Sequence, residues 1–206
     1  MCGIIGYIGK QNAIPILIEG LKRLEYRGYD SAGIALFNKG KIEVRRCAGK
    51  IRELENSIKG EDLKSFAGIG HTRWATHGKP SEENAHPHKA GHVVLVHNGI
   101  IENYLELKTE LKEKGHVFTS ETDTEVICHL ISSYIQKCHN IKEATQKAIK
   151  HLKGAYALGI ICEDEPDKIV AVRKDSPLVV GLGDKEFFIA SDIPAFLSHT
   201  KDVIIL

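Results

Sequence analysis

The order of strand-like and helical segments restricts the fold more than any other feature of this sequence. Two strand-like segments, residues 32–37 and 41–47, flank Asn38-Lys39-Gly40, which is a typical β-hairpin signal. A hairpin joins antiparallel neighbours, so this pattern disfavours a doubly wound parallel sheet. We therefore expect an α+β architecture in which helices cover largely antiparallel sheets.

Hydrophobic spacing predicts the other elements. Ile14, Leu17, Leu21 and Leu24 recur at helical spacing behind Asn12, a favourable cap, and Thr122-Asp123-Thr124-Glu125 has the pattern of a capping box. The helices expected are 12–25, 51–59, 102–114, 123–138, 141–152 and a short one at 193–197. The further strands expected are 2–9, 67–74, 93–97, 154–162, 169–173, 178–180 and 187–190. A long polar loop is expected over 75–92, and a loop of that length is usually either functional or disordered.

Composition narrows the class of protein. The chain has 206 residues and a formal charge of +1, with no linker, repeat or charge block, so we expect one domain over residues 1–206. The balanced charge gives no sign of a nucleic-acid partner or an anionic membrane surface. No apolar run is long enough to span a bilayer, and the start lacks a secretion signal, which predicts a cytoplasmic protein with free thiols.

Cys2 is the cysteine whose position carries chemical information. Five cysteines occur without a CxxC pair, and Cys128 and Cys162 lie inside apolar runs. Removal of Met1 would place an α-amine, with a pKa of about 7.7–8.0, on the same residue as a thiol of pKa about 8.5. Such an amine can act as the base that activates the thiol as a nucleophile. The alternative is that Cys2 is a small residue at the start of a buried strand.

Five sequence segments, taken in their order along the chain, distinguish between these two interpretations of Cys2. They are CGIIG (2–6), RGYDSAG (27–33), GHTRWATHG (70–78), HNGIIENY (97–104) and SETDTE (120–125). Together they resemble the class II glutamine amidotransferases, which are N-terminal nucleophile hydrolases. The resemblance implies a four-layer αββα sandwich with largely antiparallel sheets.

Finer details resemble one branch of that class. RGYDSAG, TRWATHG, AHPH (85–88) and ASD (190–192) are similar to the glutaminase domains of glutamine–fructose-6-phosphate aminotransferases. That resemblance implies a carboxy-terminal sugar isomerase domain as partner, a homodimeric full-length enzyme, and transfer of glutamine-derived ammonia to fructose 6-phosphate. The chain ends in an apolar run, DVIIL (202–206), so we expect the domain to be cut short there and the isomerase domains to be absent.

The resemblance assigns the catalytic residues. Cys2 would attack glutamine and form a γ-glutamyl thioester, releasing ammonia and then glutamate. The Asn98 side-chain amide and the Gly99 backbone N–H would form the oxyanion hole, where such donors are worth roughly 2.7–4 kcal/mol each. Asn-Gly is also a strong turn signal, so a plain turn after the strand 93–97 is the competing interpretation.

The resemblance also implies a substrate site. Arg73 would bind the α-carboxylate of glutamine through its forked guanidinium, and Asp123 would face the α-ammonium group. The competing interpretations are a surface ion pair for Arg73 and a helix-dipole position for Asp123. Trp74 would belong to a lid over residues 74–81 that orders on glutamine binding. The remaining expected site residues are Thr76, His77 and His86, which would line the site, and Arg27 and Gly28 beside the nucleophile.

Two other interpretations stay open. His86, His88, His92 and His97 lie close in sequence and could suggest a metal site, but the resemblance accounts for His77 and His86 without one, so we expect no metal and no cofactor. The chain could also be the glutaminase domain of another class II amidotransferase, or an inactive glutamine-binding regulatory module.

Overall fold

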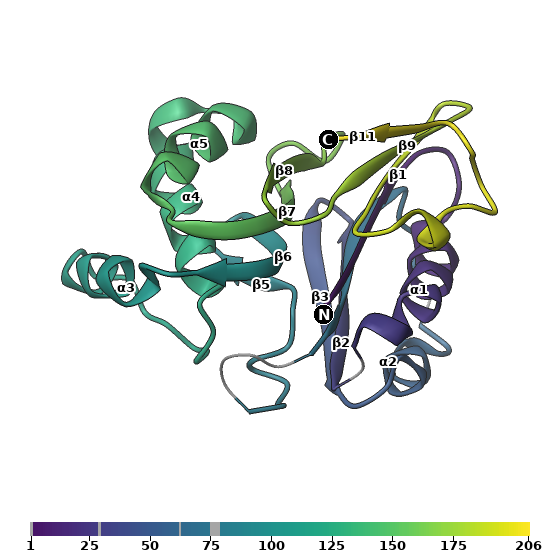
Figure 1. Ribbon diagram of the computed structural model, residues 1–206, viewed down its shortest axis with the longest axis horizontal. Helices are drawn as coiled ribbons and strands as arrows, with labels where there is room; N and C mark the ends of the chain where they lie inside the picture. The colour runs from purple at the N-terminus through teal and green to yellow at the C-terminus, as the bar shows by residue number, and fades with distance from the viewer. Residues whose placement is uncertain (1, 29, 62, 75–78) are drawn as a thin grey trace.

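The computed structural model describes residues 2–28, 30–61, 63–74 and 79–206, and within them two antiparallel sheets form the centre of the fold (Figure 1). The larger sheet has the strand order β11-β9-β10-β1-β4-β2-β3. Its strands are β1 (Gly3–Ile8), β2 (Ser31–Asn38), β3 (Lys41–Ala48), β4 (Ala67–Arg73), β9 (Val179–Gly183), β10 (Glu186–Ala190) and β11 (Val203–Ile205). The smaller sheet contains, in order, β5 (His88–Ala90), β6 (Val93–Ile101), β7 (Gly154–Cys162) and β8 (Val170–Lys174).

Helices cover the outer face of each sheet. On the larger sheet lie α1 (Ala13–Arg23) and α2 (Ile51–Ile58), and on the smaller sheet α3 (Tyr104–Glu113), α4 (Glu125–Cys138) and α5 (Ile141–Ala148) (Figure 1). The described part of the chain also contains three short 3₁₀ turns: η1 (Glu25–Arg27), η2 (Ile149–His151) and η3 (Ile193–Ala195). The expected four-layer αββα sandwich is confirmed.

The alternation of side chains along β1 explains how one strand joins two layers. Ile4 packs with Ile69 and Val94 in the apolar layer between the two sheets, whereas Ile5 packs with Leu17 and Leu21 of α1. Successive residues of a strand point to opposite faces, so β1 needs apolar side chains on both. Ile4 and Ile5 are fully buried, and each contributes about 1.5–3 kcal/mol from burial.

Several expectations for local structure are confirmed. The hairpin joins β2 and β3 through Lys39 and Gly40, which both have positive φ. Helix α1 begins after Asn12, whose side chain accepts a hydrogen bond from the Ile14 N–H at 3.4 Å. Across residues 2–28, 30–61, 63–74 and 79–206, no helix has the length and apolar character that crossing a bilayer requires.

Other interpretations of the local sequence, including the competing one for Asn98 and Gly99, are wrong. Asn98 and Gly99 form no turn, because β6 continues through Ile101 and pairs them with Ala157 and Tyr156 of β7. The segment expected to be a loop contains β5, which pairs with the start of β6. The capping box is also wrong: α4 begins at Glu125, and no side chain caps its first turn.

Candidate active site

Cys2 lies at the amino-terminal end of the central strand of the larger sheet. It directly precedes β1, and Gly3 is opposite Thr72 of β4, which brings Cys2 beside the end of β4. The Trp74 backbone N–H donates a hydrogen bond to Cys2 Sγ at 3.3 Å. Burial raises the pKa of the Cys2 thiol, while the Trp74 N–H and the Arg73 guanidinium act in the opposite direction. The thiol therefore needs a base close by to become a nucleophile at neutral pH.

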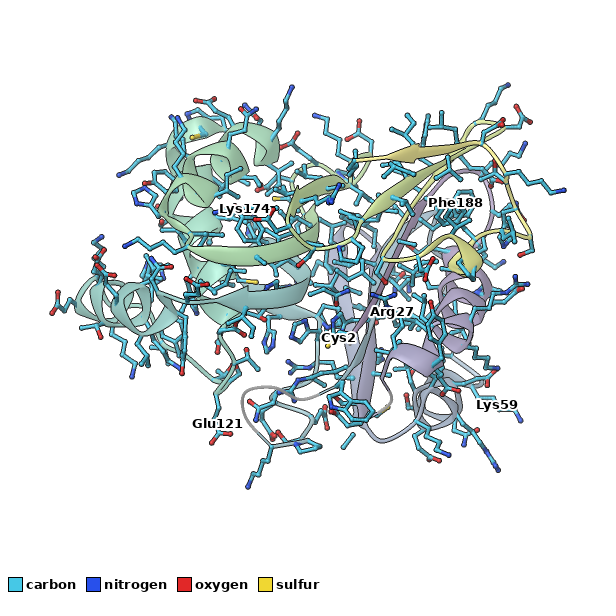
Figure 2. All side chains as sticks on the ribbon, in the orientation of Figure 1. Cys2, Arg27, Lys59, Glu121, Lys174 and Phe188 are labelled. Atoms are coloured by element: carbon cyan, nitrogen blue, oxygen red, sulfur yellow. The ribbon has the colours of Figure 1, made fainter. Side chains whose placement is uncertain are left out.

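The segment after α1 holds the Cys2 backbone in place. Arg27 Nε donates to the Cys2 carbonyl oxygen at 3.1 Å, and the Arg27 guanidinium also contacts Asp192 at 3.4 Å. Figure 2 shows Cys2 and Arg27 next to each other near the middle of the molecule. Gly28 follows directly, and its carbonyl oxygen accepts a hydrogen bond from the Thr72 hydroxyl. A Cβ on Gly28 would lie 2.9 Å from the Trp74 nitrogen, so glycine lets this segment approach the end of β4.

Asn98 reaches Cys2 from the smaller sheet. Its Nδ2 donates to the Cys2 carbonyl oxygen at 3.1 Å, which leaves the second hydrogen of the amide for another acceptor. Gly99 has φ of 126°, and a Cβ there would collide with the Ala155 carbonyl oxygen of β7. Only glycine fits this position, because both the backbone conformation and the closeness of β7 exclude a side chain.

A cavity of about 270 Å³ opens beside Cys2. Arg73 and Asp123 line it, and both are buried, with exposed fractions of 4% and 5%. The surface ion pair considered for Arg73 is therefore wrong. Asp123 lies ahead of α4, not in its first turn, and its Oδ2 accepts from the Ile101 N–H at 2.8 Å. A cavity with one buried cation and one buried anion is suited to a small zwitterion such as an amino acid.

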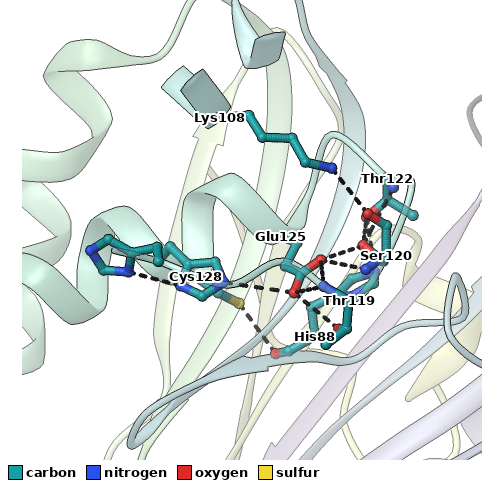
Figure 3. A network of polar contacts seen from close by, with 9 residues as sticks. His88, Lys108, Thr119, Ser120, Thr122, Glu125 and Cys128 are labelled. Atoms are coloured by element: carbon teal, nitrogen blue, oxygen red, sulfur yellow. Dashed lines mark hydrogen bonds and ion pairs between the residues drawn. The ribbon is translucent and has the colours of Figure 1, made fainter. Parts of the chain in front are cut away.

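A network of polar contacts holds the loop before α4, the loop that carries Asp123, and Figure 3 shows Thr119, Ser120 and Thr122 of that loop around Glu125. The buried Glu125 carboxylate accepts hydrogen bonds from the backbone and hydroxyl groups of Thr119 and Ser120, at 2.7–3.1 Å. Burial alone would raise the pKa of Glu125, but the His129 ring 3.6 Å away and the hydrogen bonds from Thr119 and Ser120 outweigh it and hold the pKa well below its usual range. Glu125 therefore stays charged, and its hydrogen bonds connect Thr119 and Ser120 of the loop to the first residue of α4.

Four buried histidines pack together, and two of them, His86 and His97, line the cavity. The His86 ring stacks on His71 at 4.1 Å between centroids, and His88 and His97 lie at 4.8 and 6.4 Å from it. Burial lowers the pKa of all four, to about 3 for His71 and His88. His92 lies apart at the surface, paired with Asp164. In the described ranges, no group of three or more His, Cys, Asp or Glu side chains is arranged to hold a metal ion.

The structure brings most of the expected site residues together. Those that line the cavity are Cys2, Arg27, Arg73, Trp74, His86, Asn98, Gly99 and Asp123, and Gly28 lies directly behind Trp74. Thr76 and His77, and most of the expected lid, fall outside the described residues. Sequence reasoning missed six lining residues: His97, Ile100, Thr122, Thr124, Ser176 and Pro177. The first four fall inside the segments 97–104 and 120–125, whereas no sequence signal marks Ser176 and Pro177.

The four-layer sandwich with a cysteine at the start of its central strand defines an N-terminal nucleophile hydrolase fold. A family model described as a glutamine amidotransferase domain matches residues 71–198. The chain therefore belongs to the glutamine amidotransferase family.

Individual relatives agree with this assignment. The chain is 56% identical to a Clostridium tetani protein and 57% identical to an Aquifex aeolicus protein, both named glutamine–fructose-6-phosphate aminotransferase (isomerizing). Each alignment covers the whole chain but only 34% and 35% of the relative, so the chain spans about a third of the length of these curated relatives. The solved structure of a B. subtilis glutamine phosphoribosylpyrophosphate amidotransferase matches all of this chain and 44% of its own, with a TM-score of 0.82 and 30% identity.

Proposed function

We propose that this chain hydrolyses glutamine to glutamate and ammonia, with the Cys2 thiol as nucleophile. The observation that carries the proposal is the cavity beside Cys2, in which a buried guanidinium and a buried carboxylate face the same space. Arg73 would bind the α-carboxylate of glutamine and Asp123 its α-ammonium group. This arrangement would leave the side-chain amide of the substrate directed toward Cys2 Sγ.

The reaction begins once Met1 has been removed. The free α-amine of Cys2 takes the thiol proton, directly or through a water molecule, and the sulfur attacks the amide carbon of glutamine. Negative charge then develops on the amide oxygen, where the Asn98 Nδ2–H and the Gly99 N–H would stabilise it. The protonated α-amine returns the proton to the leaving nitrogen, ammonia departs, and a γ-glutamyl thioester remains. Water cleaves this thioester, which releases glutamate and restores the thiol.

The remaining site residues would support binding. Arg27 and Gly28 hold the backbone around Cys2, and His86 forms part of the cavity wall. Trp74 is the single tryptophan and is 53% exposed at the edge of the cavity. Thr76 and His77, which lie outside the described residues, would also contact the substrate.

A larger role follows from the names of the relatives. In a full-length protein of their kind, the ammonia would pass to a carboxy-terminal sugar isomerase domain and convert fructose 6-phosphate to glucosamine 6-phosphate, in a cytoplasmic homodimer. The chain of 206 residues by itself would produce glutamate and ammonia but no aminosugar. The identity of 56–57% to these aminotransferases, against 30% to the phosphoribosylpyrophosphate enzyme, favours this branch over another class II amidotransferase.

The proposal is tested by an amino-terminal mass measurement followed by an assay of glutamate release. We expect a chain without Met1 that is active, and a Cys2→Ala variant that is inactive. Cys47→Ala is the matched control, because Cys47 is a partly exposed thiol outside the cavity, and it should keep full activity. A cleanly processed wild type that binds glutamine without hydrolysing it would instead identify a regulatory module. Full activity with Met1 in place would overturn the N-terminal nucleophile mechanism.

A further inference from the structure

His71 makes a contact that the mechanism above does not use. It lies in the middle of the larger sheet on β4, opposite Ile4 of β1 and Gly33 of β2, and is 1% exposed. Its Nε2 lies 3.0 Å from Asn98 Oδ1 and 3.0 Å from the His97 carbonyl oxygen. Both neighbours are hydrogen-bond acceptors, so Nε2 must carry the hydrogen and donate.

The Asn98 amide therefore lies between one donor and one acceptor. On one side its Oδ1 accepts from His71 Nε2, and on the other its Nδ2 donates to the Cys2 carbonyl oxygen at 3.1 Å. Rotating the amide by half a turn would place Oδ1 against the Cys2 carbonyl and Nδ2 against the His71 N–H. Both hydrogen bonds would be lost, because an acceptor would then face an acceptor and a donor would face a donor. Such contacts are unfavourable for buried polar groups.

We propose that His71 is a positioning residue that holds the Asn98 amide with its NH₂ group toward the nucleophile, so that the oxyanion hole is formed before substrate arrives. This inference rests on the proposed glutaminase function and adds a residue to it. Without His71, only the Cys2 carbonyl oxygen would favour this orientation, so the flipped amide, which presents no donor to the developing negative charge, would be populated more.

The surroundings of His71 suit this role. Its ring is stacked against His86 with an interplanar angle of 18°, and its strand is hydrogen-bonded on both sides, so the ring has little freedom. Among the described residues, no group hydrogen-bonds to its Nδ1. Because burial lowers the pKa of His71 to about 3, the ring stays neutral with a single N–H, on the nitrogen that faces Asn98.

The test compares three substitutions of His71 in the glutaminase assay. His71→Leu removes the donor, and we expect kcat to fall on the order of tenfold with KM for glutamine unchanged, because the oxyanion exists only in the transition state. His71→Gln places an amide N–H near the position of Nε2 and should retain kcat within about threefold. His71→Asn is equally polar but too short to reach Asn98, and it should lose as much as the leucine variant. The Gln and Asn pair keeps the test decisive if His71→Leu does not fold.

A double-mutant cycle separates positioning from a general structural role. Asn98→Ala alone should lower kcat by about 10²–10³. Adding His71→Leu to Asn98→Ala should cost no more than about twofold further, since the amide to be positioned is gone. His92→Leu, at an exposed histidine far from the cavity, is the control and should leave kcat unchanged.

Two results would overturn the inference: equal activity of the Gln, Asn and Leu variants, or full additivity of His71→Leu with Asn98→Ala. Failure of the proposed function would look different, because the wild type itself would then release no glutamate.

Discussion

Lowering the pH should destabilise this fold through its buried histidines. The pKa of His71 and of His88 is held at about 3, against about 6.5 for an exposed imidazole. Because the pKa of each histidine is lower in the folded state, the histidines bind protons in the unfolded chain at pH values at which they stay neutral in the folded chain. The stability that neutral histidine provides is therefore complete above about pH 6.5 and is lost as the pH falls below it.

The size of the effect follows from these pKa values. At about one pH unit below 6.5, each such histidine lowers the free energy of unfolding by about 1.4 kcal/mol, so His71 and His88 together lower it by about 3 kcal/mol. His86 and His97, whose pKa values burial also lowers, add to this loss. A domain of this kind has a total stability of about 5–15 kcal/mol, so the loss is a substantial share of it.

The assay is urea unfolding followed by far-ultraviolet circular dichroism, at about pH 7.5 and about pH 5.5. We expect a free energy of unfolding lower by at least about 3 kcal/mol at the lower pH. His88→Gln should reduce that difference by about 1.4 kcal/mol, whereas His139→Gln, at an exposed position after α4, should leave it unchanged. Equal free energies of unfolding at the two pH values would refute the reasoning.

Three further substitutions test the geometry of the site. Gly28→Ala should lower kcat more than about tenfold, because the new Cβ pushes against the Trp74 nitrogen that hydrogen-bonds to Cys2 Sγ; unchanged glutamate release would contradict this. Arg73→Lys should raise KM for glutamine by about tenfold or more, since the forked guanidinium is lost, and a KM equal to that of the wild type would argue against carboxylate binding there. Glu125→Gln should lower the free energy of unfolding by about 1–3 kcal/mol in urea titrations, with exposed Glu53→Gln as control; equal losses in both variants would rule out the buried hydrogen-bond network as the cause.

The layered fold could be predicted from the sequence because its main signals are local. Asn38-Lys39-Gly40 alone indicates a hairpin, and Asn12 caps α1 whatever surrounds it. The four-layer fold and the set of site residues were predicted from the order of the sequence motifs along the chain. Their coming together around one cavity is a property of the two sheets, which bring Cys2 and Asn98 within one hydrogen bond across 96 positions.

The features that sequence reasoning missed depend on contacts distant in sequence. Asn98 and Gly99 have a strong turn propensity, but pairing with Ala157 and Tyr156 keeps them in β6. Glu125 has the spacing of a capping residue, yet its carboxylate binds Thr119 and Ser120 ahead of the helix. Ser176 and Pro177 reach the cavity only because the chain crosses from β8 back to the larger sheet.

The central claim is that Cys2, with a free α-amine, is the nucleophile at this cavity. The most direct measurement is peptide mapping by mass spectrometry after reaction with the glutamine analogue diazo-oxo-norleucine. The reagent should label Cys2 in chains that lack Met1, in step with the loss of glutamate release, and leave the other four cysteines unmodified. Inactivation with the label on any other residue, or on chains that retain Met1, would contradict the account.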